Sequence, residues 1–248
     1  MIDLRPVGYV IGLLLVTLGA MMVFPMALDY ASGNDNWMAF FEAAIVTATV
    51  GGMLALSCAN AARGGKGITL RQSFVLTTAT WVALPVFGAL PFMFGEPDAS
   101  ATNAIFEAVS GVTTTGTTVF SGLDDLPPGT NLWRAILQWL GGLGIVIVAM
   151  IFLPVMKVGG MQFFRSEGFD TLGKILPRAF DIAAALIRVY IMLTVASALS
   201  YFALGMSGFD AVVHALTTVS TGGFSNSDIS FAKFDSNMEL VAIVFMLL

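Results

Sequence analysis

One short motif occurs twice in this chain, and each copy lies between long apolar segments although it is too short to cross a membrane. The copies occupy residues 103–118 and 210–225, and they align residue by residue without a gap. In each copy an apolar helical run ends in valine and is followed by a hydroxyl pair, one further residue and glycine. Because a helix needs about 20 apolar residues to span a bilayer, we predict two half-membrane helices, at 101–112 and 210–219, each ending in irregular backbone.

The residues after each predicted half-helix offer oxygen atoms without carrying charge; we call 113–118 the first strip and 220–225 the second strip. Irregular backbone at membrane depth is tolerated only where it is buried in protein or lines a watery cavity. Carbonyl oxygens can replace the hydration shell of a monovalent cation. A Ser/Thr/Gly-rich extracellular loop is the alternative, and it is weakened because the pattern occurs twice in the same setting. The predicted ion-binding residues are Thr113, Thr114, Thr115, Gly116 and Thr117 in the first strip and Ser220, Thr221, Gly222 and Gly223 in the second.

The composition assigns the chain to the polytopic membrane proteins. It is 57% hydrophobic and 11% charged, with a mean hydropathy of +0.87, which leaves too few charges to cover a soluble protein of this size. The N-terminal apolar run exceeds the core of a signal peptide and lacks an evident cleavage site, so we predict a retained helix. The lone Cys58 permits no disulfide within the chain and is interpreted as a structural thiol.

Longer apolar segments flank the half-helices, and no separate soluble domain is expected. Pro85 and Pro91 predict a kink in the third segment. The loop at 157–178 is predicted to contain turns and an interfacial helix. The predicted segments are 7–28, 38–62, 72–94, 133–156, 189–206 and 238–248.

Basic residues predict the orientation in the membrane. Every Lys and Arg except Arg134 and Lys233 lies at the N-terminus, in the loops after the second and fourth segments, or at Arg188. Cytoplasmic loops are enriched in such residues, so the N-terminus is predicted to be cytoplasmic. Arg188 is interpreted as an interface residue that extends towards the headgroups. Both half-helices then enter from the outside, and the two repeats are parallel.

Polar residues on the half-helices suggest roles in supporting the strips. Glu107 and His214 occupy equivalent positions. They either hold the strips from behind or are ordinary, satisfied polar residues of packed helices. Asn103 and Asp210 begin the half-helices and are predicted to be their N-caps.

The sequence offers few residues suited to catalysis or to proton transfer. The chain has a single histidine and no paired Cys/His ligands, no Ser-His-Asp spacing and no phosphate-binding loop, so we predict that it is not an enzyme. No acidic residue is expected deep in a membrane helix, which argues against proton coupling. Acidic residues on the outer side either concentrate cations at a pore mouth or are ordinary loop charges. They are Asp98, Asp124, Asp125, Asp228 and Asp235.

The chain resembles the Trk/Ktr/HKT family of potassium transporters, and most closely the TrkH type of membrane subunit. The resemblance covers nearly the whole chain and is specific. The stretches that carry it are 88–92, 109–118, 133–145, 153–161 and 209–225.

The resemblance implies a pore built from four helix–half-helix–helix repeats, each supplying one filter glycine, here Gly116 and Gly223. It also implies two extra helices in front of the repeats, and potassium as the transported ion without a resident cofactor. The implied partners are the lipid bilayer, a second pore subunit in a homodimer, and a cytoplasmic nucleotide-binding regulatory subunit of the TrkA type. No nucleic acid is implied.

The predicted fold is an all-α polytopic membrane protein with two N-terminal helices followed by parallel helix–half-helix–helix pore repeats. Two of four expected repeats are present and the second is truncated, so we expect the front half of a longer subunit. The predicted units are an extension (1–70), a first repeat with its cytoplasmic loop (71–180) and a second repeat (181–248). The predicted function is potassium uptake through a channel-like pore in the inner or plasma membrane; the alternative is a potassium symporter coupled to protons or sodium.

Overall fold

The computed structural model describes residues 3–62, 68–156 and 175–248, and every regular element in these ranges is helical. The prediction of an all-α fold is therefore confirmed. Among the described residues, four helical stretches are long and apolar enough to cross a membrane: Arg5–Ala31, Trp37–Ala59, Arg71–Phe94 and Ala184–Ala203. The elements are α1 (Arg5–Met21), α2 (Val23–Ala31), α3 (Trp37–Ala62), α4 (Leu70–Gly88), α5 (Leu90–Phe94), α6 (Ala101–Val112), α7 (Pro128–Met156), α8 (Ile175–Ala203), α9 (Gly208–Val219), the 3₁₀ helix η3 (Ser230–Lys233) and α10 (Ser236–Leu247).

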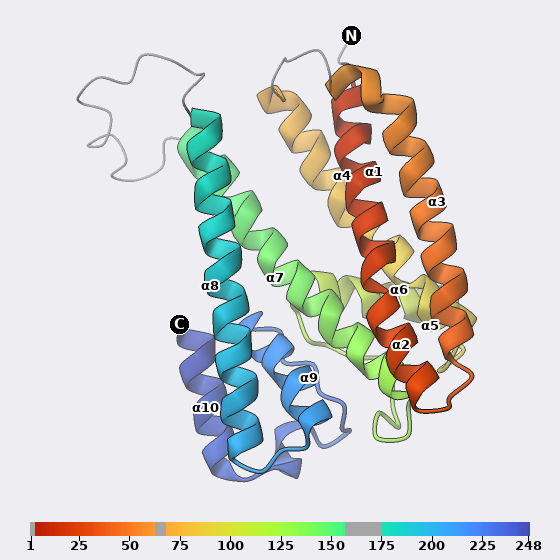
Figure 1. The fold of residues 1–248 in the computed structure, drawn as a ribbon, viewed down its shortest axis with the longest axis vertical. Helices are drawn as coiled ribbons and strands as arrows, with labels where there is room; N and C mark the ends of the chain where they lie inside the picture. Colours follow the sequence, from red (N-terminus) through yellow and green to blue (C-terminus); the bar gives the residue numbers. More distant parts are fainter. Residues whose placement is uncertain (1–2, 63–67, 157–174) are drawn as a thin grey trace, which may run out of the picture.

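Helix α7 connects two groups of helices. Figure 1 shows α1, α3 and α4 side by side as one bundle, with α7 crossing obliquely from this bundle towards α8. The short helix α6 packs against α7 from the first group, and α9 packs against it from the second. Both half-helices therefore share α7 as a common support.

The first and third predicted segments are each interrupted. Helix α1 passes into α2 at Met22, and α4 passes into α5 at Ala89. The second break lies between Pro85 and Pro91, where the sequence predicts a kink, because proline lacks a backbone N–H and clashes with the preceding turn. The kink is confirmed. Pro25 lies in the first turn of α2, where proline is tolerated.

The half-helices occupy the positions that the motif predicts. Helix α6 spans 101–112 as predicted, and α9 begins two residues early at Gly208. Helix α7 begins at Pro128 instead of residue 133. Proline suits the first helical position because its fixed φ matches the helix and its missing N–H would have no helical partner there.

The predicted start of the fifth segment, at residue 189, was wrong. Helix α8 begins at Ile175 and continues through Arg178 and Asp181. A count of apolar residues stops at such positions although the backbone remains helical. The interfacial helix predicted between α7 and α8 falls mainly on 157–174, which lie outside the described residues.

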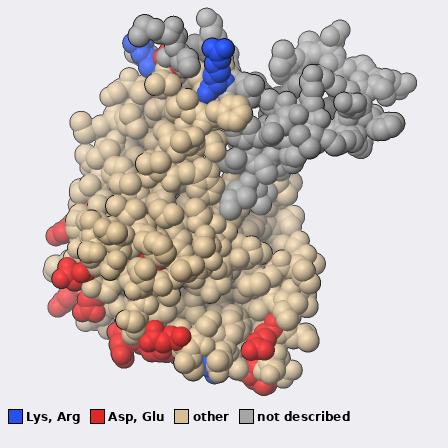
Figure 2. Space-filling view, turned by 180° about the vertical axis from the view of Figure 1, so that it is seen from behind, with Lys and Arg blue, Asp and Glu red and all other residues tan. Residues whose placement is uncertain are grey.

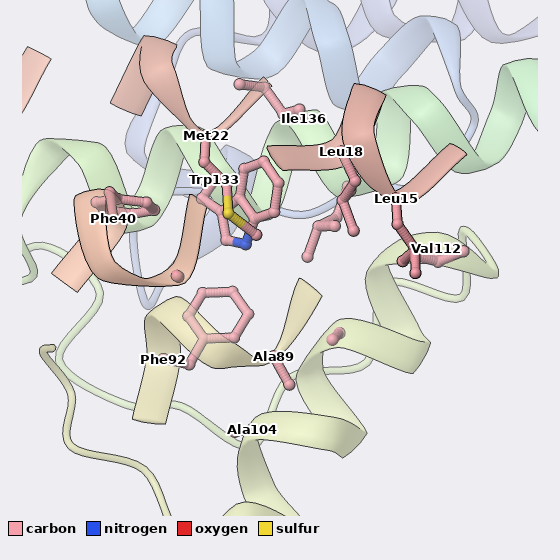
Figure 3. Close-up of a cluster of buried hydrophobic side chains, with 13 residues drawn as sticks. Leu15, Leu18, Met22, Phe40, Ala89, Phe92, Ala104, Val112, Trp133 and Ile136 are labelled. Carbon is pink, nitrogen blue, oxygen red and sulfur yellow. The ribbon is translucent and has the colours of Figure 1, made fainter. Parts of the chain in front are cut away.

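The N-terminal helices and the first repeat share one hydrophobic core. Figure 3 shows Leu15 of α1 and Met22, at the junction of α1 and α2, in the same cluster as Trp133 of α7. Trp133 is fully buried, and its ring lies 6.3 Å from that of Phe40 on α3, centroid to centroid, in an edge-on contact. Its Nε1 donates a hydrogen bond of 2.8 Å to the backbone oxygen of Gly88 at the end of α4. Helix α7 is thus fixed to α1, α3 and α4 close to the strips.

Asp29 ties the N-terminal helices to the start of α7. It is fully buried, and its carboxylate accepts hydrogen bonds from the Gly129 N–H at 2.6 Å and from Asn36 Nδ2 at 2.8 Å. The carboxylate therefore lies at a helix N-terminus, where free N–H groups and the helix dipole stabilise negative charge. Asp29 lies in the last turn of α2, one residue beyond the predicted end of the first segment.

Charged side chains separate along the long axis of the molecule. In Figure 2 most described Lys and Arg side chains lie at the end that carries the N-terminus, whereas Asp and Glu gather towards the opposite end. This separation is compatible with the orientation predicted from the positive-inside pattern.

Candidate ion-binding site

Both half-helices begin with a serine N-cap. Ser100 Oγ accepts a hydrogen bond from the Asn103 N–H at 3.4 Å, and Ser207 Oγ accepts one from the Asp210 N–H at 3.1 Å. The assignment of Asn103 and Asp210 as caps was therefore wrong by three residues. They occupy the third helical position and donate the N–H groups that the caps satisfy.

The half-helices end in the same backbone conformation. Thr114 and Thr221 hold equivalent positions and have φ values of 55° and 54°, in the left-handed region that few residues besides glycine adopt. Their N–H groups donate to Gly111 and Thr218 oxygens, both at 2.9 Å. The next N–H in each copy, of Thr115 and of Gly222, donates to the oxygen one residue earlier, of Ser110 at 3.0 Å and of Thr217 at 2.9 Å. This is a Schellman ending, which directs the last N–H groups back towards the helix.

The strips that follow present carbonyl oxygens without partners. Gly116 and Gly223 share a φ of 77°, so the two copies keep matching backbones past the turn. Within the described ranges, the backbone oxygens of 113–117 and 220–224 accept no hydrogen bond. A row of free carbonyl oxygens is the arrangement that a partly dehydrated alkali cation needs.

The first hydroxyl group of each strip is engaged by its own half-helix. Thr113 Oγ1 donates to the Val109 oxygen at 2.7 Å, and Ser220 Oγ donates to the Leu216 oxygen at 2.9 Å. The backbone carbonyls are therefore more available to a cation than these two hydroxyls.

The two strips lie against each other. A side chain added at Gly116 would collide with the backbone oxygen of Gly222. The structure thus brings together predicted residues from both repeats, although they are more than 100 positions apart in sequence. Their exposure alternates along each strip: Thr113, Thr115, Thr117, Thr221 and Gly223 are exposed, Thr114 and Gly116 are half-buried, and Ser220 and Gly222 are buried.

A buried ion pair lies behind the strips. Glu107 on α6 and Arg134 on α7 are 0% and 1% exposed, and Glu107 Oε1 lies 2.8 Å from Arg134 Nε. Glu107 also accepts hydrogen bonds from Thr118 Oγ1 at 2.8 Å and from the Val119 N–H at 3.0 Å. Of its two predicted roles, Glu107 therefore has the first, because it holds the end of the first strip.

Arg134 extends this support to the second strip. One terminal nitrogen donates to the Ser225 oxygen at 2.7 Å, and the other donates to Thr118 Oγ1 at 3.2 Å. The guanidinium carbon lies 4.4 Å from the centre of the Phe224 ring, a cation–π contact. A single buried side chain therefore contacts both strips. Sequence reasoning placed Arg134 on the outer side and missed this role.

His214 supports the second strip as Glu107 supports the first. His214 Nε2 lies 3.1 Å from Ser225 Oγ, and Ser225 is the counterpart of Thr118 in the repeat. The other ring nitrogen, Nδ1, lies 2.8 Å from the Asp210 backbone oxygen. The same contact between half-helix and strip is thus made with two different side-chain chemistries.

Two aspartates join the outer loops that follow the strips. Asp124 accepts a hydrogen bond from the Asp228 N–H at 3.1 Å, and Asp228 accepts one from the Gly122 N–H at 2.9 Å. The hydrogen bond from the Asp228 backbone, together with those from the Lys233 and Ser227 side chains, lowers the pKa of Asp124. Both carboxylates therefore connect the two outer loops by hydrogen bonds. This role differs from both roles predicted for the outer acidic residues.

Half-helices that end in carbonyl-lined strips, set among helices long enough to cross a bilayer, define an α-helical membrane protein of the ion-transport class. A family model described as TrkH, a cation transport protein, matches residues 36–248. The chain belongs to this family, as the sequence resemblance indicates.

Similar proteins of known description agree with this assignment. The chain is 40% identical over 237 residues to the Trk system potassium uptake protein TrkI of Halomonas elongata, covering 95% of this chain and 47% of that protein. It is 38% identical over 250 residues to TrkH of Escherichia coli K12, covering 98% and 51% respectively. The crystal structure of the potassium transporter TrkH from Vibrio parahaemolyticus matches with a TM-score of 0.87 at 33% identity, covering 99% of this chain and 49% of that one. The chain thus spans about half the length of these relatives.

Proposed function

We propose that this chain contributes two adjacent filter strips to a pore for potassium uptake. The observation that supports this most directly is the pair of matched strips, each with free backbone oxygens, in contact at Gly116 and Gly222. Carbonyl oxygens fixed in this way can replace water around a potassium ion. The descriptions of the relatives as potassium uptake proteins point to the same ion.

Within this proposal the pore is channel-like, and a potassium symporter coupled to protons or sodium is the alternative. A proton-coupled mechanism would need an acidic side chain close to the strips that can take up and release a proton. Glu107 is the candidate, because it is buried and hydrogen-bonded to Thr118 of the first strip. Its carboxylate is paired with Arg134, whose guanidinium stays charged, and it accepts two further hydrogen bonds. These contacts engage both carboxylate oxygens, which suits a supporting role better than that of a proton carrier.

The proposal extends to surroundings and partners. The N-terminus would be cytoplasmic in an inner or plasma membrane, because the basic side chains gather at that end. Four filter glycines would close the pore, and Gly116 and Gly223 would be two of them. A homodimer of pore subunits and a cytoplasmic nucleotide-binding subunit of the TrkA type complete the proposed assembly.

Ion flux into liposomes that contain the full-length subunit tests the mechanism. We expect a potassium gradient alone to drive rubidium uptake, because a pore needs no co-ion. Measurement of rubidium entry with sodium absent and the same pH on both sides would show it. A requirement for sodium, or proton movement in fixed proportion to rubidium, would contradict the channel-like pore and favour the symporter. Empty liposomes provide the control.

A further inference from the structure

We infer that Gln138 of α7 is a positioning residue that sets the direction of the Gly223 carbonyl in the second strip. The inference rests on the proposed function, because it assigns a residue to the strip that would bind the ion. Gln138 is fully buried, and its Oε1 accepts a hydrogen bond of 3.0 Å from the Phe224 N–H.

The hydrogen bond to the Phe224 N–H also determines where the Gly223 carbonyl points, because both groups belong to one planar peptide unit. The Gly223–Phe224 peptide bond is trans, so its N–H and its C=O point in opposite directions. Because Gln138 holds the N–H towards α7, the Gly223 oxygen must point away from α7. Gly223 is exposed, and a side chain added there would meet no atom within 4 Å. The Gly223 oxygen is therefore directed to the open side of the strip, where an ion can approach.

The other end of the amide lies where the strips meet. Gln138 Nε2 would be 2.7 Å from a side-chain carbon added at Gly222 and 3.7 Å from one added at Gly116. This nitrogen is buried and has no hydrogen-bond partner among the described residues. Buried donors without partners are rare and disfavour the folded state. The stability of the fold alone therefore does not explain why residue 138 carries a side-chain amide. The need for a hydrogen-bond acceptor opposite the Phe224 N–H does explain it.

The two strips differ in this respect. Thr117 aligns with Phe224, and its N–H donates no hydrogen bond within the described ranges. In the first strip the corresponding support comes two residues later, where Glu107 accepts from the Val119 N–H. Gln138 thus fixes one carbonyl of one repeat, and its loss should change ion preference before it changes the fold.

The test compares Gln138→Met with Gln138→Glu in the full-length subunit. Methionine keeps the length of the side chain but removes the acceptor, whereas glutamate keeps an oxygen opposite Phe224. We expect Gln138→Met to lower the ratio of rubidium to sodium uptake into liposomes by about three- to tenfold, the effect of one hydrogen bond. Gln138→Glu should keep the ratio close to that of the parent.

Trp139→Phe is the matched control, because it changes the neighbouring residue of α7 and removes a 3.0 Å hydrogen bond, from Trp139 Nε1 to Thr194 Oγ1 of α8, that involves no residue of either strip. It should leave the ratio unchanged. The inference is overturned if Gln138→Met reduces uptake of both ions equally, or if Gln138→Glu loses as much discrimination as Gln138→Met. Gly223→Ser, measured in parallel, shows whether a negative result concerns only Gln138 or the assignment of the strips as the ion filter. If it alters the ratio and Gln138→Met does not, only the inference fails; if neither alters it, the filter assignment fails.

Discussion

Replacement of Arg134 by methionine in the full-length subunit is expected to lower the free energy of unfolding by about 3–5 kcal/mol, or to prevent folding altogether. The change leaves the Glu107 carboxylate buried at 0% exposure without its cation. It also removes the donor to the Ser225 oxygen, so both strips lose a shared support. Thermal unfolding of the purified protein in detergent, followed by near-UV circular dichroism, would measure the loss.

Two further variants make this expectation specific to the buried pair. Adding Glu107→Gln to Arg134→Met should recover part of the stability, because no unpaired charge then remains and the amide oxygen can still accept from Val119. Lys233→Met is the control: it breaks the Lys233–Asp124 pair, in which the side chains are 40% and 45% exposed, and should change stability little. Equal effects of Arg134→Met and Lys233→Met would contradict a supporting role for Arg134.

Gly116→Ser should impair ion discrimination more than any other single change in the strips. Its φ of 77° lies where a side chain costs about 1–2 kcal/mol, and the added carbon would also collide with the Gly222 oxygen. Both effects displace carbonyls of both strips. We expect the ratio of rubidium to sodium uptake to fall by at least about tenfold, measured in liposomes with the full-length subunit.

Gly223→Ser and Gly33→Ser separate strain from collision. Gly223 has the same φ of 77° but open space around it, so its variant should show a smaller loss of discrimination. Gly33 has a φ of 69° and lies in the turn between α2 and α3, and its variant should lose some stability with no change in ion preference. An unchanged ratio in Gly116→Ser would remove the first strip from the ion path.

The repeated motif made the half-helices and strips predictable, because helix length and the hydroxyl–glycine pattern are local properties. The nearly equal φ values at Thr114 and Thr221 follow from the similar local sequence. The N-caps were predicted three residues late because Ser, Asn and Asp are all good caps, and composition alone does not choose between Ser100 and Asn103.

Interactions between distant residues could not be predicted in this way. Arg134 and Glu107 are 27 positions apart on different helices, and their pairing depends on how α6 and α7 pack. The burial of Asp29 depends likewise on the position of Gly129 at the start of α7. The hydrogen bond from Phe224 to Gln138 joins the second repeat to a helix of the first, 86 positions away. These contacts belong to the tertiary structure, which supports the strips that the sequence reveals.

We propose that free carbonyl oxygens of the two strips bind the transported cation. A structure of the full-length subunit determined with thallium or rubidium in place of potassium tests it most directly, through anomalous difference density. We expect density within coordination distance of backbone oxygens from both 113–116 and 220–223. Cation density confined to other parts of the molecule, with the strips turned towards lipid, would contradict it.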